Sequence, residues 1–424
     1  MAEAVGAGIA AELEQDVLER LLRYVRIDTQ SASDSTTYPS TAKQRDLGEL
    51  LAHELRELGL VDAEIDEHGY VFATVPGGAG PTVGLIAHVD TSPDESGAGV
   101  RPRVIRGYEG GEISFPGNPR QSLRPEDSAL LGERVGHDIV TTDGTTLLGA
   151  DDKAGVAEIM AAVAYLVRHP EIEHAPIRVG FTVDEEVGRG VEHFDIDEFG
   201  ADFAYTLDGA ELCKIDEETF SASELRVVIR GHSVHPGTSK GKMVNSIKLA
   251  ARMLESLPRD TLSPETTEER EGFVHPVRIS GATAETTITF ILRDFDGEQL
   301  RQHEQLLRDL AAAIERDEPR AEIEIAVEQS YRNMKEYLEA RPRILDAADE
   351  ATRRVGLEPV RGSIRGGTDG ALLSARGLLT PNLFTGGQEY HSVREWISVQ
   401  DMATSAAMVV ELVKLWAAPD WRDG

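Results

Sequence analysis

Cysteine is almost missing from this chain: Cys213 is the only one among 424 residues. A single cysteine cannot form an intrachain disulfide, and its scarcity suits a reducing compartment. The segment 7–25 carries acidic residues where a signal peptide would need an apolar core, and its apolar residues have helical spacing. We therefore expect an amphipathic first helix and a cytoplasmic protein.

Basic residues are also scarce, with 43 Lys and Arg against 75 Asp and Glu and a formal net charge of −32. Such a chain has no basic excess to displace counterions, so we expect no nucleic-acid partner. It contains no apolar run of transmembrane length, so we expect no membrane association. The acidic excess fits solubility and a negative cleft that attracts cations or amino groups.

Several common catalytic signatures are missing as well. The chain has no His-Glu-x-x-His, no Gly-x-Ser-x-Gly, no Walker loop and no Gly-x-Gly-x-x-Gly after a strand. The sequence Gly-His-Ser-Val-His at 231–235 approaches the serine pattern but ends in histidine. These absences argue against the common zinc proteases, serine hydrolases and nucleotide-binding enzymes.

The order of predicted strands and helices indicates two kinds of architecture along the chain. Strand-like and helix-like segments alternate from Val71 to Leu207, with strands predicted at 71–75 and 83–89 and a buried helix at 155–168, which indicates α/β structure with a largely parallel sheet. Between residues 223 and 327 the order becomes strand, helix, strand, helix, strand, and α/β character returns after about Met334. A chain of this length is expected to form two domains. We predict a catalytic domain from 1–219 and 333–424, with 220–332 inserted as an α+β domain.

One predicted strand ends in a histidine and an aspartate, His88 and Asp90. Residues two apart share a face of a strand, so the two side chains emerge together. A neutral imidazole can bind a metal, and a carboxylate beside it can fix its tautomer. A histidine that is merely hydrogen-bonded to a loop aspartate is the alternative for this pair.

Other acidic and histidine residues recur at comparable places in the sequence. They are Asp151 and Asp152 at a strand-to-helix turn before a buried helix, Glu185 and Glu186 after the strand 177–183, Asp208 after the strand 203–207, and His391 in the C-terminal part. Each has an ordinary explanation alone, such as a helix cap or an acidic loop. Because ligands in open α/β sheets bind beyond the carboxyl ends of the strands, together they predict one site.

The donors at this site are oxygen and imidazole without cysteine, which favours a catalytic zinc, cobalt or manganese site over a structural one. Asp151, Glu186 and Asp208 would supply three negative charges, while His88 and His391 supply none. Two divalent cations with a bridging hydroxide would come close to neutrality. A single cation would leave surplus negative charge, so we predict two.

Motifs at these positions resemble the M20 metallopeptidases, and within them the tripeptide aminopeptidases, over nearly the whole chain. The most specific stretches are HVDTSPD at 88–94, GADDKAG at 149–155, DEEVG at 184–188, HPGT at 235–238, RDFD at 293–296 and RGGTDG at 365–370. The resemblance implies a zinc-exopeptidase-like catalytic domain, with a mostly parallel sheet flanked by helices. It also implies an inserted, ferredoxin-like α+β lid or dimerisation domain.

The same resemblance implies two zinc ions, for which Co²⁺ or Mn²⁺ could substitute. His88, Asp151 and Asp208 would bind one ion. Asp151, Glu186 and His391 would bind the other, so that Asp151 bridges the two.

The resemblance also implies roles for the neighbours of these ligands. Asp90 would orient His88, and Glu185 would be the general base, because a metal-bound carboxylate such as Glu186 is too acidic for that task. A cis peptide bond would follow Asp151.

Four residues further along the chain are implied in substrate binding. His235 would act on the tetrahedral intermediate from the other subunit of a homodimer formed through the inserted domain. Asn245, Arg293 and Arg365 would hold the carboxylate end of the substrate. A surface histidine before a Pro-Gly turn is the alternative for His235, and an ion pair with Asp294 or Asp296 is the alternative for Arg293.

The expected function is removal of the N-terminal residue from tripeptides, with small peptides as the partners. A length limit follows if the free amine and the terminal carboxylate are both held at a fixed separation. The alternatives within the family are a dipeptidase and a deacylase of N-acyl amino acids. Outside enzymes, the alternatives are a metal-dependent peptide-binding protein without catalysis and a purely structural metal site.

Overall fold

The structure is a computed structural model that describes residues 6–422. The chain divides into two compact units. The first unit takes the chain through Glu217, then Tyr337–Gly362, then the described residues from Thr368 onward. The second takes Glu218–Glu336 and Ser363–Gly367.

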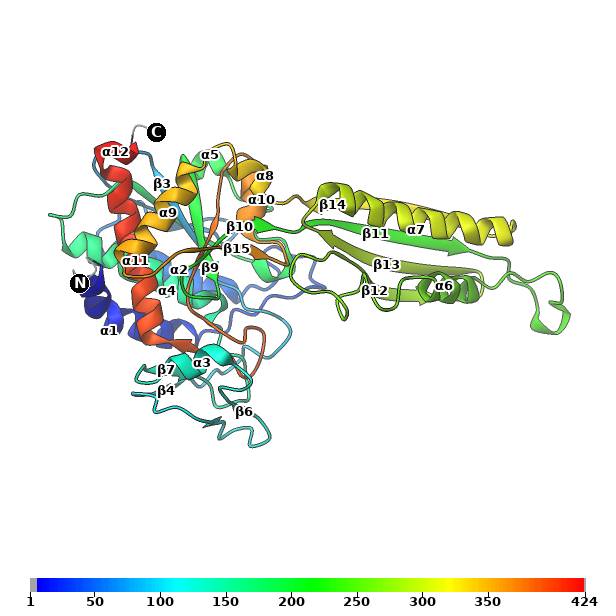
Figure 1. The fold of residues 1–424 in the computed structure, drawn as a ribbon, viewed down its shortest axis with the longest axis horizontal. Helices are drawn as coiled ribbons and strands as arrows, with labels where there is room; N and C mark the ends of the chain where they lie inside the picture. Colours follow the sequence, from blue (N-terminus) through cyan, green and yellow to red (C-terminus); the bar gives the residue numbers. More distant parts are fainter. Residues whose placement is uncertain (1–5, 423–424) are drawn as a thin grey trace. The chain divides into compact units, whose positions relative to one another are not determined.

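An eight-stranded mixed sheet forms the framework of the first unit (Figure 1). Its order is β1 (Glu64–Ile65), β2 (Val71–Val75), β8 (Ile177–Thr182), β3 (Val83–His88), β9 (Phe203–Gly209), β16 (Asn382–Phe384), β10 (Lys214–Thr219) and β15 (Val360–Ile364). The neighbours β8, β3, β9 and β16 run parallel to one another. β2 is antiparallel to β8, and β10 is antiparallel to β16. Four carboxyl ends therefore lie at one edge, as the predicted α/β class requires.

Helices pack against this sheet and against one another (Figure 1). α4 (Ala150–Arg168) contacts β3 and β9, and it packs with α1 (Ala7–Tyr24) and α11 (Val399–Ala417), while α9 (Arg343–Arg354) packs on α11. α2 (Gln44–Glu57) packs on β2. α4 is apolar on nearly every side because it is buried along nearly its whole length, and α1 buries its apolar stripe as predicted.

Smaller elements complete the chain. A three-stranded sheet has the order β17 (Ile397–Ser398), β7 (Ile139–Thr141), β4 (Arg103–Ile105), and β5 (Ile113–Ser114) pairs with β6 (Ser122–Leu123). The short helices are α3 (Ala129–Glu133), α5 (Ile196–Phe199), α8 (Lys335–Leu338), α10 (Asp369–Ala375) and α12 (Pro419–Arg422), with 3₁₀ turns at Glu185–Val187 and Pro236–Thr238. Along residues 6–422, every helix is too short or too polar to cross a lipid bilayer.

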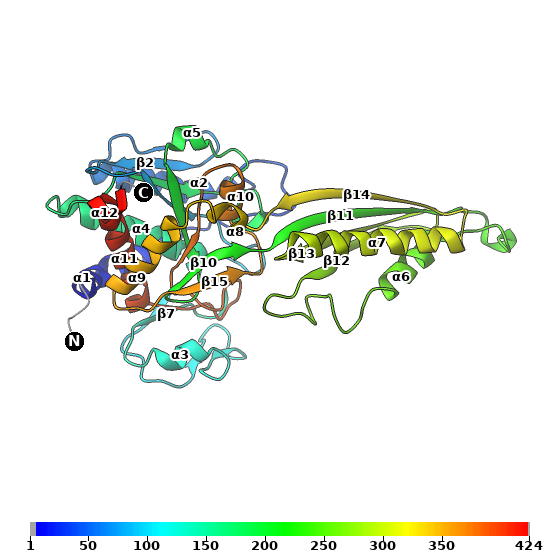
Figure 2. The ribbon, with the colours of Figure 1, turned by 45° about the horizontal axis from the view of Figure 1, so that its top comes forward.

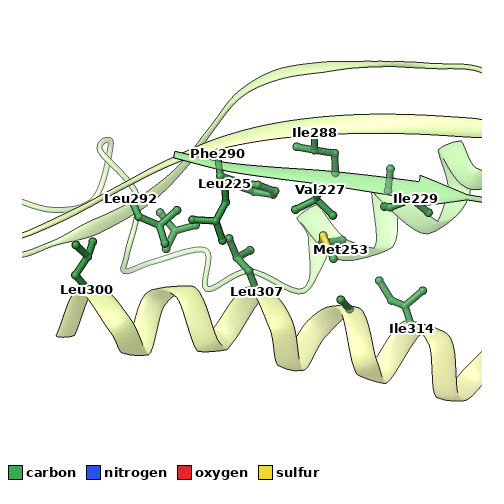
Figure 3. Packing of buried hydrophobic residues seen from close by; sticks show 13 residues of the cluster. Leu225, Val227, Ile229, Met253, Ile288, Phe290, Leu292, Leu300, Leu307 and Ile314 are labelled. Carbon is green, nitrogen blue, oxygen red and sulfur yellow. The ribbon is translucent and has the colours of Figure 1, made fainter. Parts of the chain in front are cut away.

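The second unit is an antiparallel sheet with two helices on one face (Figure 2). Its elements follow as β11 (Ser221–Arg230), α6 (Ser246–Glu255), β12 (Phe273–Gly281), β13 (Glu285–Asp294), α7 (Gly297–Asp317) and β14 (Glu322–Tyr331), and the strand order is β12-β13-β11-β14. This βαββαβ succession is the ferredoxin-like arrangement. Figure 3 shows its core, where apolar residues of β11 and β13 meet Leu300, Leu307 and Ile314 of α7.

The sequence pattern predicted three strands in this unit, and the structure has four. The missed strand is β12, which contains Pro276 and lies at the edge of the sheet. Its pairing with β13 shifts register between Pro276 and Arg278. Proline cannot donate to a ladder and is confined to edges and bulges, so this strand lacks the regular alternation from which the other strands were predicted.

Candidate metal centre

His88 lies at the carboxyl end of β3 and is only 3% exposed. Its Nδ1 is 3.3 Å from Oδ1 of Asp90 and 3.1 Å from the Asp90 carbonyl oxygen. Its Nε2 is 3.1 Å from Oδ1 of Asp151 and 3.6 Å from Oδ1 of Asp208. The ring therefore presents one nitrogen to Asp90 and the other to two carboxylates.

Asp151 reaches this place from the start of α4. The sequence pattern predicted a strand-to-helix turn here, but residues 142–149 form a loop, and the strand before that loop, β7, belongs to the separate small sheet. Asp151 and Asp152 have non-helical dihedral angles, with φ, ψ of −83°, 104° and −118°, 31°. The carboxylates thus stand on an irregular turn before the regular helix.

The two adjacent aspartates have different partners. The peptide bond between Asp151 and Asp152 is cis, as the family resemblance implied. Oδ2 of Asp152 accepts a hydrogen bond from the backbone N–H of His88 at 3.1 Å, and Oδ1 accepts one from Gly155 at 3.2 Å. Asp152 therefore joins β3 to α4, while Asp151 faces the histidines.

Glu185 and Glu186 lie on the 3₁₀ turn that follows β8. Asp184 precedes the turn in the left-handed region, with φ of 57°. The backbone N–H groups of Glu185 and Glu186 donate to Oδ1 and Oδ2 of Asp90 at 3.0 and 3.2 Å. The buried Asp90 carboxylate therefore contacts both this turn and the ring of His88.

Two groups of three side chains in this region could each hold a metal ion. His88, Asp151 and Asp208 form one group and Asp151, Glu186 and His391 the other, with the donor atoms of each group within 4.8 Å of one another. Nε2 of His391 is 3.2 Å from Oδ2 of Asp151 and 3.0 Å from Oε2 of Glu186. Asp151 is shared, because Oδ1 faces His88 and Oδ2 faces His391.

The residues of the two groups fit divalent cations. Within the part of the chain that the structure describes, Oε1 of Glu186 is buried without a hydrogen-bond partner. Burial and the nearby Asp151 raise the pKa of Glu186 to about 8, and burial raises the pKa of Asp208 to about 6. Cations would offset this crowding of buried carboxylates, and oxygen with imidazole is a donor set that zinc and manganese accept.

Glu185 lies beside these groups but belongs to neither. Burial, together with neighbouring carboxylates that include Asp208 and Asp369, raises the pKa of Glu185 well above its usual range. Asp369, at the start of α10, is itself buried and accepts a hydrogen bond from Oγ1 of Thr182 at 2.7 Å. A raised pKa makes the carboxylate a stronger base, which suits proton transfer.

Two acidic residues at this centre, Asp94 and Asp369, had no role predicted from the sequence. Oδ2 of Asp94 is 3.2 Å from Nδ1 of His391, so Asp94 contacts this histidine much as Asp90 contacts His88. Both residues lie inside the stretches that carry the family resemblance. Their position in these stretches was the only sequence signal that either residue belongs to the centre. An exposed loop aspartate such as Asp94 and a helix-terminal aspartate such as Asp369 each have ordinary explanations.

The other four predicted residues lie in the second unit, and two of them have local capping contacts. Nδ1 of His235 accepts a hydrogen bond from the N–H of Gly237 at 3.1 Å, and His235 is exposed at this turn. Oδ1 of Asn245 caps α6 by accepting from the N–H of Ile247 at 3.0 Å.

Arg293 and Arg365 have different surroundings within that unit. The Arg293 guanidinium lies over the ring of Tyr331 at 5.3 Å, and the described residues give it no ion pair with Asp294 or Asp296. Neighbours on a strand face opposite sides, which turns Asp294 away. The Arg365 guanidinium donates to backbone carbonyl oxygens of residues 269 and 271 at 2.7 and 3.0 Å, so it supports a loop.

The chain is similar to known peptidases. The sequence model of peptidase family M20/M25/M40 matches residues 141–415. A relative from Geobacillus thermodenitrificans named Peptidase T is 46% identical over 407 residues, which cover 95% of this chain and 99% of the relative.

Two solved structures have similar folds. One is an aminopeptidase from Bacillus cereus, with a TM-score of 0.74, 22% identity and coverage of 96% of this chain and 99% of that one. The other is a tripeptidase from Staphylococcus aureus, with a TM-score of 0.74, 23% identity and coverage of 95% and 98%. At these identities the likeness shows the fold.

Proposed function

The chain belongs to peptidase family M20/M25/M40, and on this premise we propose that it is a di-zinc aminopeptidase that releases the N-terminal residue from tripeptides. The observation that carries the proposal is the pair of donor groups that share Asp151, with Glu185 beside them. The names of the relatives, Peptidase T, aminopeptidase and tripeptidase, support the substrate class.

We assign His88, Asp151 and Asp208 to one zinc ion, and Asp151, Glu186 and His391 to the other. Co²⁺ or Mn²⁺ are substitutes that the same donors would accept. When bound, the two ions would polarise the scissile carbonyl and lower the pKa of water.

Glu185 is the proposed general base. It takes a proton from the attacking water and returns it to the leaving amine. Two observations support this assignment: its carboxyl belongs to neither donor group, and its raised pKa lets it hold the proton between the two transfers.

Asp90 is the proposed orienting residue. Its carboxylate lies at Nδ1 of His88 and accepts the backbone N–H groups of Glu185 and Glu186. One buried side chain would thereby hold a metal ligand, the base and a second ligand in a fixed relation.

For substrate recognition we propose that His235, from the other subunit of a homodimer, donates to the tetrahedral intermediate. Arg293, Asn245 and Arg365 would hold the terminal carboxylate. Support is strongest for Arg293, because burial lowers its pKa and the described residues give it no carboxylate partner. A length limit follows if the free amine and the terminal carboxylate of the substrate are held at a fixed separation.

A panel of substrates tests this proposal directly. Turnover of the metal-loaded enzyme is measured on di-, tri- and tetrapeptides of alanine and on N-acetylated amino acids. We expect the highest kcat/KM on the tripeptide. Preference for the dipeptide or for acetylated amino acids would overturn it in favour of a dipeptidase or a deacylase, and no turnover of any of them would favour a binding protein.

A further inference from the structure

Glu395 is a buried carboxylate, 1% exposed, four residues after His391 on the same loop. The loop is closed by mutual hydrogen bonds between Gln388 and Trp396, at 2.9 and 3.1 Å. Oγ1 of Thr141 donates to the carbonyl oxygen of Glu395 at 2.8 Å. The backbone that carries Glu395 is therefore held firmly at the point where the His391 loop returns.

The Glu395 side chain accepts three backbone hydrogen bonds from the turn that leads into α4. Oε2 accepts from the N–H groups of Leu148 and Gly149, both at 2.7 Å, and Oε1 accepts from the N–H of Asp151 at 3.0 Å. Among the described residues, no basic side chain forms an ion pair with Glu395. The neighbouring Arg394 pairs with Glu389. The Glu395 carboxylate thus accepts its hydrogen bonds from backbone amides.

These amides need an acceptor from elsewhere in the chain. The first N–H groups of a helix have no partner within it, and a negative charge there is favourable. Gly149, which precedes α4, has a left-handed φ of 80° and offers no capping side chain. Glu395, 244 residues from Asp151, supplies that acceptor and fixes the backbone on which the shared carboxylate stands.

We propose that Glu395 is a positioning residue for the metal centre, which sets the backbone of Asp151 relative to the loop that carries His391. This inference rests on the proposed function, because it takes Asp151 as the ligand common to both ions. The alternative is an ordinary helix cap, which would stabilise α4 without any effect on metal affinity.

The test compares Glu395→Gln with Glu158→Gln. The glutamine at 395 keeps the shape, but its NH₂ group cannot accept, so at least one of the three amides loses its partner. Glu158 is an equally buried glutamate on the same helix that contacts Ser405 rather than the turn at Asp151. Zn²⁺ affinity is measured by competition with a chromogenic chelator, the Co²⁺ absorption spectrum reports ligand geometry, and Tm is measured on metal-free protein.

We expect Glu395→Gln to weaken Zn²⁺ binding by about 10–100-fold and to alter the Co²⁺ spectrum, with Glu158→Gln matching wild type in both. A lower metal-free Tm with unchanged affinity and spectrum would reduce Glu395 to a helix cap and overturn the proposal. Glu395→Asp keeps the charge with a shorter reach, and it is subject to the same readouts if the glutamine variant does not fold. Wild-type protein that binds two ions but cleaves no tripeptide would overturn the proposed function alone.

Discussion

At the scale of the residue, neighbouring acids at the centre act differently because the backbone turns them toward different partners. Asp151 faces two histidines, whereas Asp152 accepts backbone N–H groups. Glu186 approaches His391, whereas Glu185 belongs to neither donor group. The sequence shows two acidic pairs, and only the geometry separates their members.

Replacing the base should separate catalysis from metal binding. We expect Glu185→Gln to lower kcat by about 10²–10⁴-fold, because the amide cannot take a proton from water. Metal content, measured by atomic emission on the same sample, should stay at the wild-type ratio.

A matched control for this variant lies on the same loop. Glu192 is a surface glutamate paired with Arg189, so Glu192→Gln should keep wild-type turnover. Near wild-type kcat in Glu185→Gln would refute the assignment of the base. Loss of metal from that variant would instead place Glu185 among the ligands.

At the scale of the element, the contact between α4 and α11 contains an acid that the site does not use. Oγ of Ser405 is 2.6 Å from Oε2 of Glu158 and 2.8 Å from the carbonyl oxygen of Phe384. A hydroxyl has one proton, and a carbonyl can only accept, so both contacts are satisfied together if Ser405 donates to Phe384 and a protonated Glu158 donates to Ser405. Burial raises the pKa of Glu158 well above its usual range, in agreement with this geometry.

This protonated acid predicts a pH dependence of stability. The folded-state pKa of Glu158 exceeds its unfolded value, so its favourable contribution is complete below about pH 4 and declines as the pH rises toward the folded pKa, by about 1.4 kcal/mol per pH unit. Glu158→Gln removes the titration. We expect the Tm of the variant, relative to wild type, to rise between pH 5 and pH 8 in calorimetric scans, and parallel Tm curves would contradict the prediction.

Elements were predictable where a local pattern is strong. β2 and β3 are short apolar runs bounded by turns, and α4 is a long apolar segment, so each was found near its observed limits. β12 was missed because Pro276 and a register shift remove the alternation. A strand was predicted directly before the turn at Asp151, but residues 142–149 form an irregular loop there. The local sequence pattern does not distinguish these two ways of entering a helix.

At the scale of the whole molecule, all donors of the two groups come from the first unit, on segments far apart in sequence. Ions that bind only the folded unit should therefore stabilise it, by about 2.7 kcal/mol per site at 100 times Kd.

The boundaries of the inserted domain and the homodimer stay predictions.

Chelation tests this linkage in calorimetry. We expect EDTA to lower the Tm of the transition that belongs to the first unit, and excess Zn²⁺ to restore it. A transition of the second unit, which carries none of the donors, should not move. An unchanged thermogram after full removal of metal would show that the ions do not hold these segments together.

The sequence by itself determined that the chain is acidic, α/β in class and equipped with His88, Glu186 and Asp208 at or just after strand ends, because strand periodicity and turn residues act locally. Only the tertiary structure decided which oxygen of Asp151 faces which histidine. It also decided that Asp94 contacts His391, and that Glu395 reaches amides 244 to 247 residues away. Periodicity specifies the face on which a side chain lies, whereas a partner so distant in sequence is chosen by how the segments pack.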